Sequence, residues 1–129
     1  MFTVLDDLLQ TLFPSYCRGC RKAIPTKTTL CLHCLSELPT TNFHLSNSNP
    51  LMKLLQQLTP ISYATSLFFF EQQGLVQQLI HQLKYMNGEQ LGSLFGSLLG
   101  QKLVGSSFLS CDLVVPIPLH RRRQRQRGY

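Results

Sequence analysis

Apolar residues at helical spacing mark three stretches of the chain. The first covers residues 2–13, where apolar side chains recur every three or four positions until Pro14 ends the pattern. Its polar positions include Asp6 and Asp7, whereas a helix that lies on a membrane surface carries basic residues there. We therefore expect residues 2–13 to form a helix that packs on the rest of the protein.

The other two helical stretches follow one another closely. Residues 75–86 place five apolar side chains on one face, and the pattern stops at Asn87-Gly88. Residues 89–104 carry a second apolar stripe and a row of glycines, each of which costs a helix roughly 0.5–1 kcal/mol relative to alanine. The row therefore predicts a close approach of this helix to a sheet or to a neighbouring helix. Its members are Gly92, Gly96 and Gly100.

Two stretches have the pattern of β-strands. Residues 61–71 concentrate β-branched and aromatic residues, and residues 112–115 end in a continuous apolar run. Pro116 and Pro118 follow, and because proline has no N–H for a ladder, this strand must end near Val115 or lie at a sheet edge. The order strand, helix, helix, strand is the opening of an α/β unit, although two strands are too few for a stable sheet.

Four cysteines form two C-x-x-C pairs with ten residues between the pairs. They supply the four thiolates of a tetrahedral zinc site, which would be structural because no position stays open for a substrate. The alternatives are disulfides, for which no secretion signal is visible, and a redox C-x-x-C, which needs one pair at a strand-to-helix turn. The predicted zinc ligands are Cys17, Cys20, Cys31 and Cys34.

The remaining candidates for the metal site are weaker. His33 lies inside the second pair and can substitute as a ligand, but Cys34 is better placed. The glycine that often follows such a turn is absent, and Arg21 and Leu35 stand there instead. We expect Cys111, the odd cysteine, to be a buried thiol at the start of the second strand.

Residues 36–60 form a polar connector rich in Ser, Thr, Asn and Pro, which favour turns. His44 is expected on a surface loop of this connector, and a short helical turn precedes Pro60. We place a boundary near residue 58. Residues 1–58 then hold the N-terminal helix, the metal module and the connector, and residues 59–129 hold part of an α/β domain.

The net charge of +6 is concentrated at one end of the chain. Residues 1–120 hold seven Lys and Arg against six Asp and Glu, and five arginines then occupy positions 121–127. Such an end predicts a partner that carries phosphates, either a nucleotide or a nucleic acid.

No membrane span or signal peptide is predicted. The apolar stretch 91–100 is about half the length of a span, and the N-terminus lacks a cationic region before its apolar residues. With 43% apolar residues, the composition is typical of a globular chain, and we expect a cytoplasmic protein.

The C-terminal stretch resembles the signature of the ComF family, phosphoribosyltransferase-like bacterial proteins linked to competence for DNA uptake. The matching residues are Asp112-x-Val-Val-Pro-x-Pro-Leu-His120, Arg123 and Arg127-Gly128-Tyr129. The string from Ile80 to Tyr85 is also similar to the family, although its His81 and Lys84 equally fit a solvated helix face. The resemblance spans nearly the whole chain and the front half of the family's length. The family's ribose-phosphate loop, an acidic pair followed by Thr-Thr-Gly, would come after Tyr129.

The resemblance implies the first half of a type I phosphoribosyltransferase-like α/β domain behind the zinc module. It implies that a loop lines the diphosphate of phosphoribosyl pyrophosphate, with guanidinium groups as donors and magnesium bridging the leaving group in an active full-length enzyme. For these 129 residues alone we expect weak binding at most and no turnover, and neither a catalytic residue nor an acceptor substrate is indicated. The implied anion-binding residues are Pro118, Leu119, His120, Arg123, Arg127 and Gly128.

A zinc-knuckle module that binds nucleic acid through a basic tail is the alternative interpretation. Its partner would be single-stranded DNA, while the resemblance also implies contact with the DNA-uptake machinery. The metal module holds few basic residues, however, and no aromatic residues alternate with the arginines as base stacking requires. A third interpretation is a solvated tail, which is how most charge runs behave.

Overall fold

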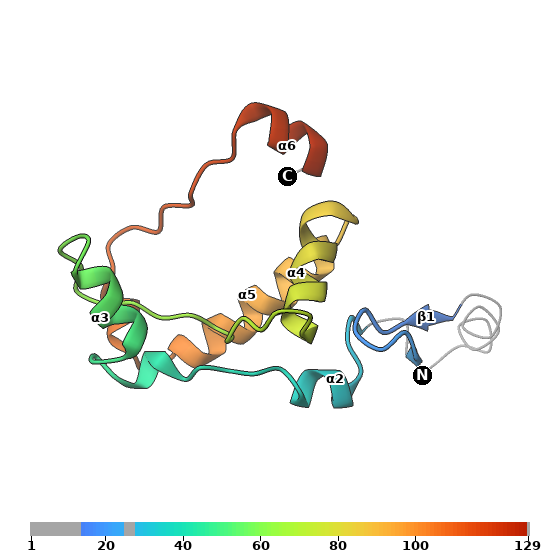
Figure 1. Ribbon diagram of the computed structural model, residues 1–129, viewed down its shortest axis with the longest axis horizontal. Coiled ribbons are helices and arrows are strands. Elements are labelled where there is room, and N and C mark those ends of the chain that lie inside the picture. Colours follow the sequence, from blue (N-terminus) through green and yellow to red (C-terminus); the bar gives the residue numbers. More distant parts are fainter. Residues whose placement is uncertain (1–13, 25–27, 129) are drawn as a thin grey trace.

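The computed structural model describes residues 14–24 and 28–128 (Figure 1). The helix predicted over residues 2–13 lies outside this range. The elements are β1 (Ser15–Tyr16), β2 (Ala23–Ile24), α2 (Leu32–Ser36), η1 (Phe43–Leu45), α3 (Pro50–Gln56), α4 (Leu75–Tyr85), α5 (Glu89–Leu103), η2 (Ser107–Ser110) and α6 (Arg121–Arg127).

Helices α4 and α5 form a hairpin, as the apolar spacing predicts. The turn between them uses Asn87 in the left-handed region, at φ 50°, followed by Gly88. A Cβ on Gly88 would lie 2.7 Å from the Cα of Leu83 and 2.8 Å from the carbonyl oxygen of Gln82. Only glycine therefore allows α5 to begin so close to the last turn of α4.

One hydrophobic core joins the cysteine-bearing segment to this hairpin. Leu79 and Leu91 are fully buried, and one cysteine of each pair, Cys17 and Cys34, packs with them. Half-buried side chains from α2, α4 and α5 surround the cluster. The buried members of this core are Cys17, Leu30, Cys34, Leu38, Val76, Leu79 and Leu91.

The connector is more ordered than its composition suggests. Asn49 is buried, and its amide donates hydrogen bonds to the carbonyl oxygens of Phe43, Ser46 and Ala64. Its Oδ1 accepts from the backbone N–H of Met52 and so caps α3, which Pro50 begins. A single side chain thus fixes the start of α3 against two neighbouring loops.

The two predicted strands do not form a sheet within the described residues. Only one bridge, between Thr40 and Phe68, involves the stretch 61–71. The stretch 112–115 is assigned no strand. Each stretch lacks a neighbouring strand long enough to complete a ladder, and the only sheet seen among residues 14–24 and 28–128 is the hairpin of β1 and β2. The α/β sheet therefore remains a prediction.

The glycine row of α5 is only partly covered. A Cβ on Gly92 would lie 3.4 Å from Leu83 Cδ1 of α4, which is the predicted approach of a neighbouring helix. A Cβ on Gly96 or Gly100 would meet no atom of the described chain within 4 Å. Gly92 therefore allows close contact between α5 and α4, whereas the side of α5 at Gly96 and Gly100 is open.

Residues 14–110, apart from the undescribed 25–27, form what we call the body, and residues 111–119 form the arm. Figure 1 shows the arm as a long connection that swings away from the helices before α6 begins. It is anchored at each end by an aromatic contact: the Phe108 ring lies 5.8 Å from Tyr63, and the Arg127 guanidinium lies 5.8 Å from the ring centroid of Tyr85. Among the described helices, none combines the length and apolarity that crossing a membrane requires.

Candidate metal centre

The first cysteine pair lies in a tight turn between β1 and β2. The backbone N–H of Cys17 donates to Lys22 O at 2.8 Å, and the N–H of Arg21 donates back to Cys17 O at 2.9 Å. Arg21 itself adopts a left-handed conformation with φ 60°. It stands where glycine is common in such turns, and a non-glycine residue there carries backbone strain.

The second pair begins helix α2. Cys31 is the N-cap, and its sulfur accepts a hydrogen bond from the backbone N–H of Cys34 at 3.4 Å. The carbonyl oxygen of Cys31 accepts from the N–H of Leu35 at 3.0 Å. The cap thus fixes the orientation of the Cys31 sulfur at the start of α2.

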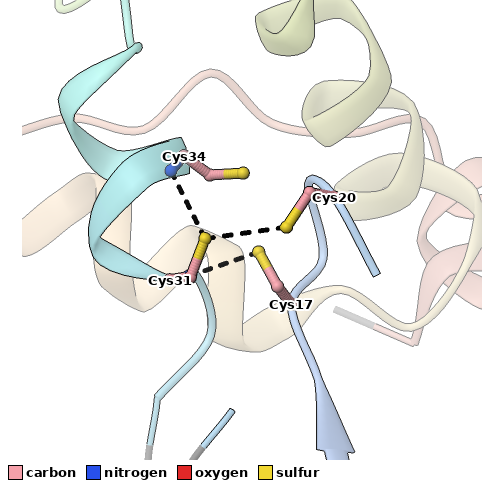
Figure 2. A group of neighbouring side chains, drawn as sticks. All are labelled: Cys17, Cys20, Cys31 and Cys34. Atoms are coloured by element: carbon pink, nitrogen blue, oxygen red, sulfur yellow. Dashed lines mark hydrogen bonds between the residues drawn. The ribbon is translucent and has the colours of Figure 1, made fainter. Parts of the chain in front are cut away.

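The four sulfurs converge on one point. Figure 2 shows all four side chains directed toward a common centre, two from each turn. All four Sγ atoms lie within 4.8 Å of one another, and the Cys20–Cys31 separation is 3.6 Å. A tetrahedral zinc with bonds of about 2.3 Å requires sulfur–sulfur edges of about 3.8 Å. The cluster can therefore hold a metal ion such as zinc, and we call these four residues the cysteine cluster.

Backbone N–H groups stabilise negative charge on Cys17. Its sulfur accepts from the N–H of Cys31 at 3.3 Å and from that of Gly19 at 3.4 Å. Burial alone would raise the pKa of this thiol, but hydrogen bonds from the backbone of Cys31, Cys20 and Gly19 outweigh it and lower the pKa to about 6. Cys17 is thus a thiolate at neutral pH.

Cys34 behaves in the opposite way. Burial, together with the thiols of Cys31, Cys20 and Cys17 and the charge on Cys17, raises the pKa of Cys34 to about 12. Without a metal the cluster therefore concentrates negative charge on one sulfur and keeps a proton on another. A divalent cation at the centre would favour the thiolate form of every ligand.

The cysteine cluster is packed directly against α4. A Cβ on Gly19 would lie 2.8 Å from Cys34 Sγ and 3.1 Å from Leu75 Cδ1, so any larger residue would push the two turns apart. The Gln82 amide donates to the carbonyl oxygen of Arg18 at 2.8 Å. The metal centre and the helical hairpin therefore share one packed unit.

Two further residues that the sequence analysis weighed are not part of the site. His33 is exposed on α2 and is no member of the cysteine cluster. Cys111 is exposed, so the prediction of a buried thiol is wrong. The reason is that the strand expected to bury it has no neighbour in the described structure.

The residues expected to bind an anion lie at the end of the arm. Pro118 is exposed, Leu119 is half-buried, and His120 is the N-cap of α6, accepting from the N–H of Arg122 at its Nδ1. The stretch expected to be a loop is helical from Arg121 to Arg127.

The guanidinium groups of α6 lie on two sides of the helix. Arg123 and Arg127 are one turn apart and share a face, and Arg127 contacts Tyr85. Gly128 ends the helix at φ 84° and instead lines a shallow hollow with Arg121, Gln124 and Arg125. Arg123 and Arg127 thus lie on one face of α6, as predicted anion-binding residues should. Gly128 lies instead beside Arg121 and Arg125.

A second hollow was not anticipated from the sequence. It lies where the first cysteine turn meets α4, close to the His81 and Tyr85 rings, whose centroids are 4.9 Å apart. The spacing of these two aromatic residues, four apart on a predicted helix, was the available signal. The hollow is lined by Arg18, Gly19, Cys20, Arg21, Gln73, Gln77, Gln78, His81, Gln82 and Met86.

Comparisons of the chain with protein-family models, curated proteins and solved structures find no significant match.

Proposed function

We propose that this chain is a zinc-stabilised, phosphate-binding protein of the ComF type, in which α6 holds the diphosphate of phosphoribosyl pyrophosphate. The observation that carries the first part is the convergence of four sulfurs within 4.8 Å of one another. Four thiol ligands, two of them buried in the core, fit a metal that folds the protein and takes no part in catalysis.

The phosphate-binding part is supported by the arm and α6. The residues that resemble the ComF signature form one continuous segment, an apolar run followed at once by a helix of five arginines. No acidic side chain forms an ion pair with these arginines in the part of the chain that the structure describes, so their charge is available to an anion. Arg123 and Arg127, on one face, present two planar donors suited to a diphosphate.

Nuclear magnetic resonance titration with magnesium and phosphoribosyl pyrophosphate tests this proposal. We expect weak binding, with a dissociation constant on the order of 1 mM, and shifts concentrated in α6 and the end of the arm. The double variant Arg123→Gln/Arg127→Gln should lose these shifts, whereas Arg121→Gln/Arg122→Gln, with the same charge change on the same helix, should retain most of them. Equal losses in both variants, or no shift in α6, would reject the proposal.

A second candidate function, binding of single-stranded nucleic acid, is favoured by the hollow beside the cysteine cluster. Arg18, Arg21 and His81 line it. The Tyr85 ring lies against His81 at an interplanar angle of 48°, and the Arg127 guanidinium lies over the tyrosine ring. Cations beside aromatic rings form the combination that binds phosphates and unstacked bases. In this arrangement the cysteine turn and α6 contribute to one surface.

Fluorescence anisotropy with a labelled oligodeoxynucleotide distinguishes the two functions. Nucleic-acid binding predicts an affinity that falls steeply with salt and is weakened by Arg18→Gln/Arg21→Gln. The sugar-phosphate function predicts no effect of that double variant on phosphoribosyl pyrophosphate binding. An affinity for DNA that is independent of both the hollow and salt would exclude the second candidate.

A further inference from the structure

The arm carries four strongly exposed apolar side chains within five positions, among them Ile117, the most exposed large apolar side chain of the described residues. Leu113, Val114, Val115 and Ile117 are between 73% and 92% exposed. Among the described residues, no backbone hydrogen bond is formed by any residue from 112 to 119. The segment thus combines apolar side chains with unpaired backbone donors and acceptors, which is the condition of an edge strand open to another chain.

The two edges of this segment are chemically different. In an extended strand, successive residues direct their N–H and C=O groups to opposite edges. Pro116 and Pro118 fall on the same edge and provide no N–H there. The opposite edge presents the complete backbone groups of Leu113, Val115 and Ile117. The arm can therefore add to a ladder through one edge only.

That complete edge is complementary to itself. When two copies pair antiparallel about Val115, Leu113 of each copy faces Ile117 of the other, and Val115 faces its own counterpart. In such a register these three residues form hydrogen-bonded pairs that exchange both N–H···O bonds, six bonds in all, and neither proline interrupts the ladder. A two-fold contact of this kind uses the same surface on both chains.

Charge favours the antiparallel direction. A parallel pairing would place the two helices of five arginines side by side, whereas the antiparallel pairing puts them at opposite ends of the ladder. It also brings Asp112, which faces the other copy's Pro118, close to the other copy's His120 at the start of α6. Asp112 is the only Asp or Glu after Glu89 in the sequence.

We propose that two copies of this chain associate through an antiparallel ladder formed by residues 113–117, with the two-fold axis at Val115. Residues 113–117 also belong to the segment that supports the proposed function, but the inference rests on the exposed arm and involves neither the cysteine cluster nor any bound phosphate. The arm lies outside the core, so changes in it should leave the folded body intact.

Sedimentation equilibrium with two matched proline variants tests the ladder. In reducing buffer, which prevents a disulfide at the exposed Cys111, we expect a species of twice the chain mass of 14.7 kDa. Val115→Pro removes two ladder bonds per pair and should raise the dissociation constant by about thirtyfold, the effect of two ordinary backbone hydrogen bonds. Val114→Pro makes the same chemical change on the unused edge and should leave the dissociation constant within about twofold of the unchanged chain, since it removes no ladder bond.

Zinc content and helical circular dichroism should be the same in both variants, which shows that the body is folded. A monomeric unchanged chain, equal weakening by the two variants, or a dimer that survives Val115→Pro unchanged would each overturn the proposal. Association that appears only with another protein would point to a different partner strand and would equally reject the two-fold ladder.

Discussion

The body and the arm are both rich in apolar residues, yet they differ completely in burial. Leu79 and Leu91 in the body have no exposed surface, whereas Leu113 in the arm is 76% exposed. The two regions have similar side chains, so hydrophobicity alone does not account for the difference. What distinguishes them is the presence of neighbouring elements that can pair with the backbone and cover the side chains.

In the body, several local constraints bring such neighbours together. The cysteine turns are fixed by hydrogen bonds to sulfur and carbonyl oxygens, and the helical hairpin is closed by Asn87-Gly88. In the arm, two prolines remove donors from one edge, and no strand of the described residues lies beside the other edge. The arm is therefore an incomplete β element, and its burial depends on what pairs with it.

Removal of the metal should show the largest difference between the two regions, because it should unfold the body. Structural zinc contributes about 10–16 kcal/mol of apparent binding energy in small zinc modules, as much as the whole stability of a typical domain. We expect Cys31→Ser or a strong chelator to abolish bound zinc and cooperative unfolding of the body, measured by elemental analysis and circular dichroism.

Cys111→Ser is the matched control, because it makes the same change in the arm, outside the cysteine cluster. It should keep one zinc per chain and an unchanged melting curve. A Cys31→Ser protein that retains a full equivalent of zinc would contradict the four-cysteine site.

Replacing a leucine by alanine should also have unequal effects on stability in the two regions. Leu79→Ala removes a fully buried side chain between the cysteine-bearing segment and α5, and it should lower the free energy of unfolding by about 2–5 kcal/mol. Leu113→Ala should change it by less than about 0.5 kcal/mol, because this side chain is already mostly exposed in the folded protein. Urea unfolding at low protein concentration measures both, and equal effects would show that the arm belongs to the core.

The sequence predicted the body much better than the arm, for a physical reason. Helices α4 and α5 satisfy their hydrogen bonds internally, so local spacing places them within one or two residues of their observed ends. The C-x-x-C pairs are equally local, since each turn brings two sulfurs together by itself. Their convergence into one cluster is what the structure adds.

The predicted strands depended on partners that local patterns do not specify. Residues 61–71 and 112–115 have the composition of strands, but a strand exists only through its neighbours, and the first contributes a single bridge. The hollow at Arg18 and Gln82 was missed for the same reason, because it forms between segments 64 positions apart.

Proton competition should weaken the metal site of the body as pH falls. The pKa of Cys34 is raised to about 12, so at neutral pH zinc must displace its proton, and affinity should rise about tenfold per pH unit for each proton released. Cys17, with a pKa lowered to about 6, adds no proton at neutral pH, but below about pH 6 it must also be deprotonated.

The expected result is therefore a zinc affinity that increases with pH and declines more steeply below about pH 6, measured by chelator competition at a series of pH values. Calorimetry in buffers with different ionisation enthalpies would count the released protons. An affinity that does not change between pH 5.5 and pH 7.5, a range of about 2 units that spans the pKa of Cys17, would contradict this protonation scheme.

The smallest expected effect concerns a strained position within the otherwise well-packed body. Arg21 holds φ 60° in the first cysteine turn, a conformation that costs a non-glycine residue roughly 1–2 kcal/mol. Arg21→Gly should relieve that cost, less about 0.5–1 kcal/mol for the greater freedom of glycine in the unfolded chain. Arg18→Gly, at a residue of the same turn without positive φ, has only the entropic term and should destabilise. Thermal unfolding of the zinc-loaded proteins should thus move in opposite directions for the two variants. If both lower the melting temperature equally, the left-handed conformation of Arg21 is not a source of strain.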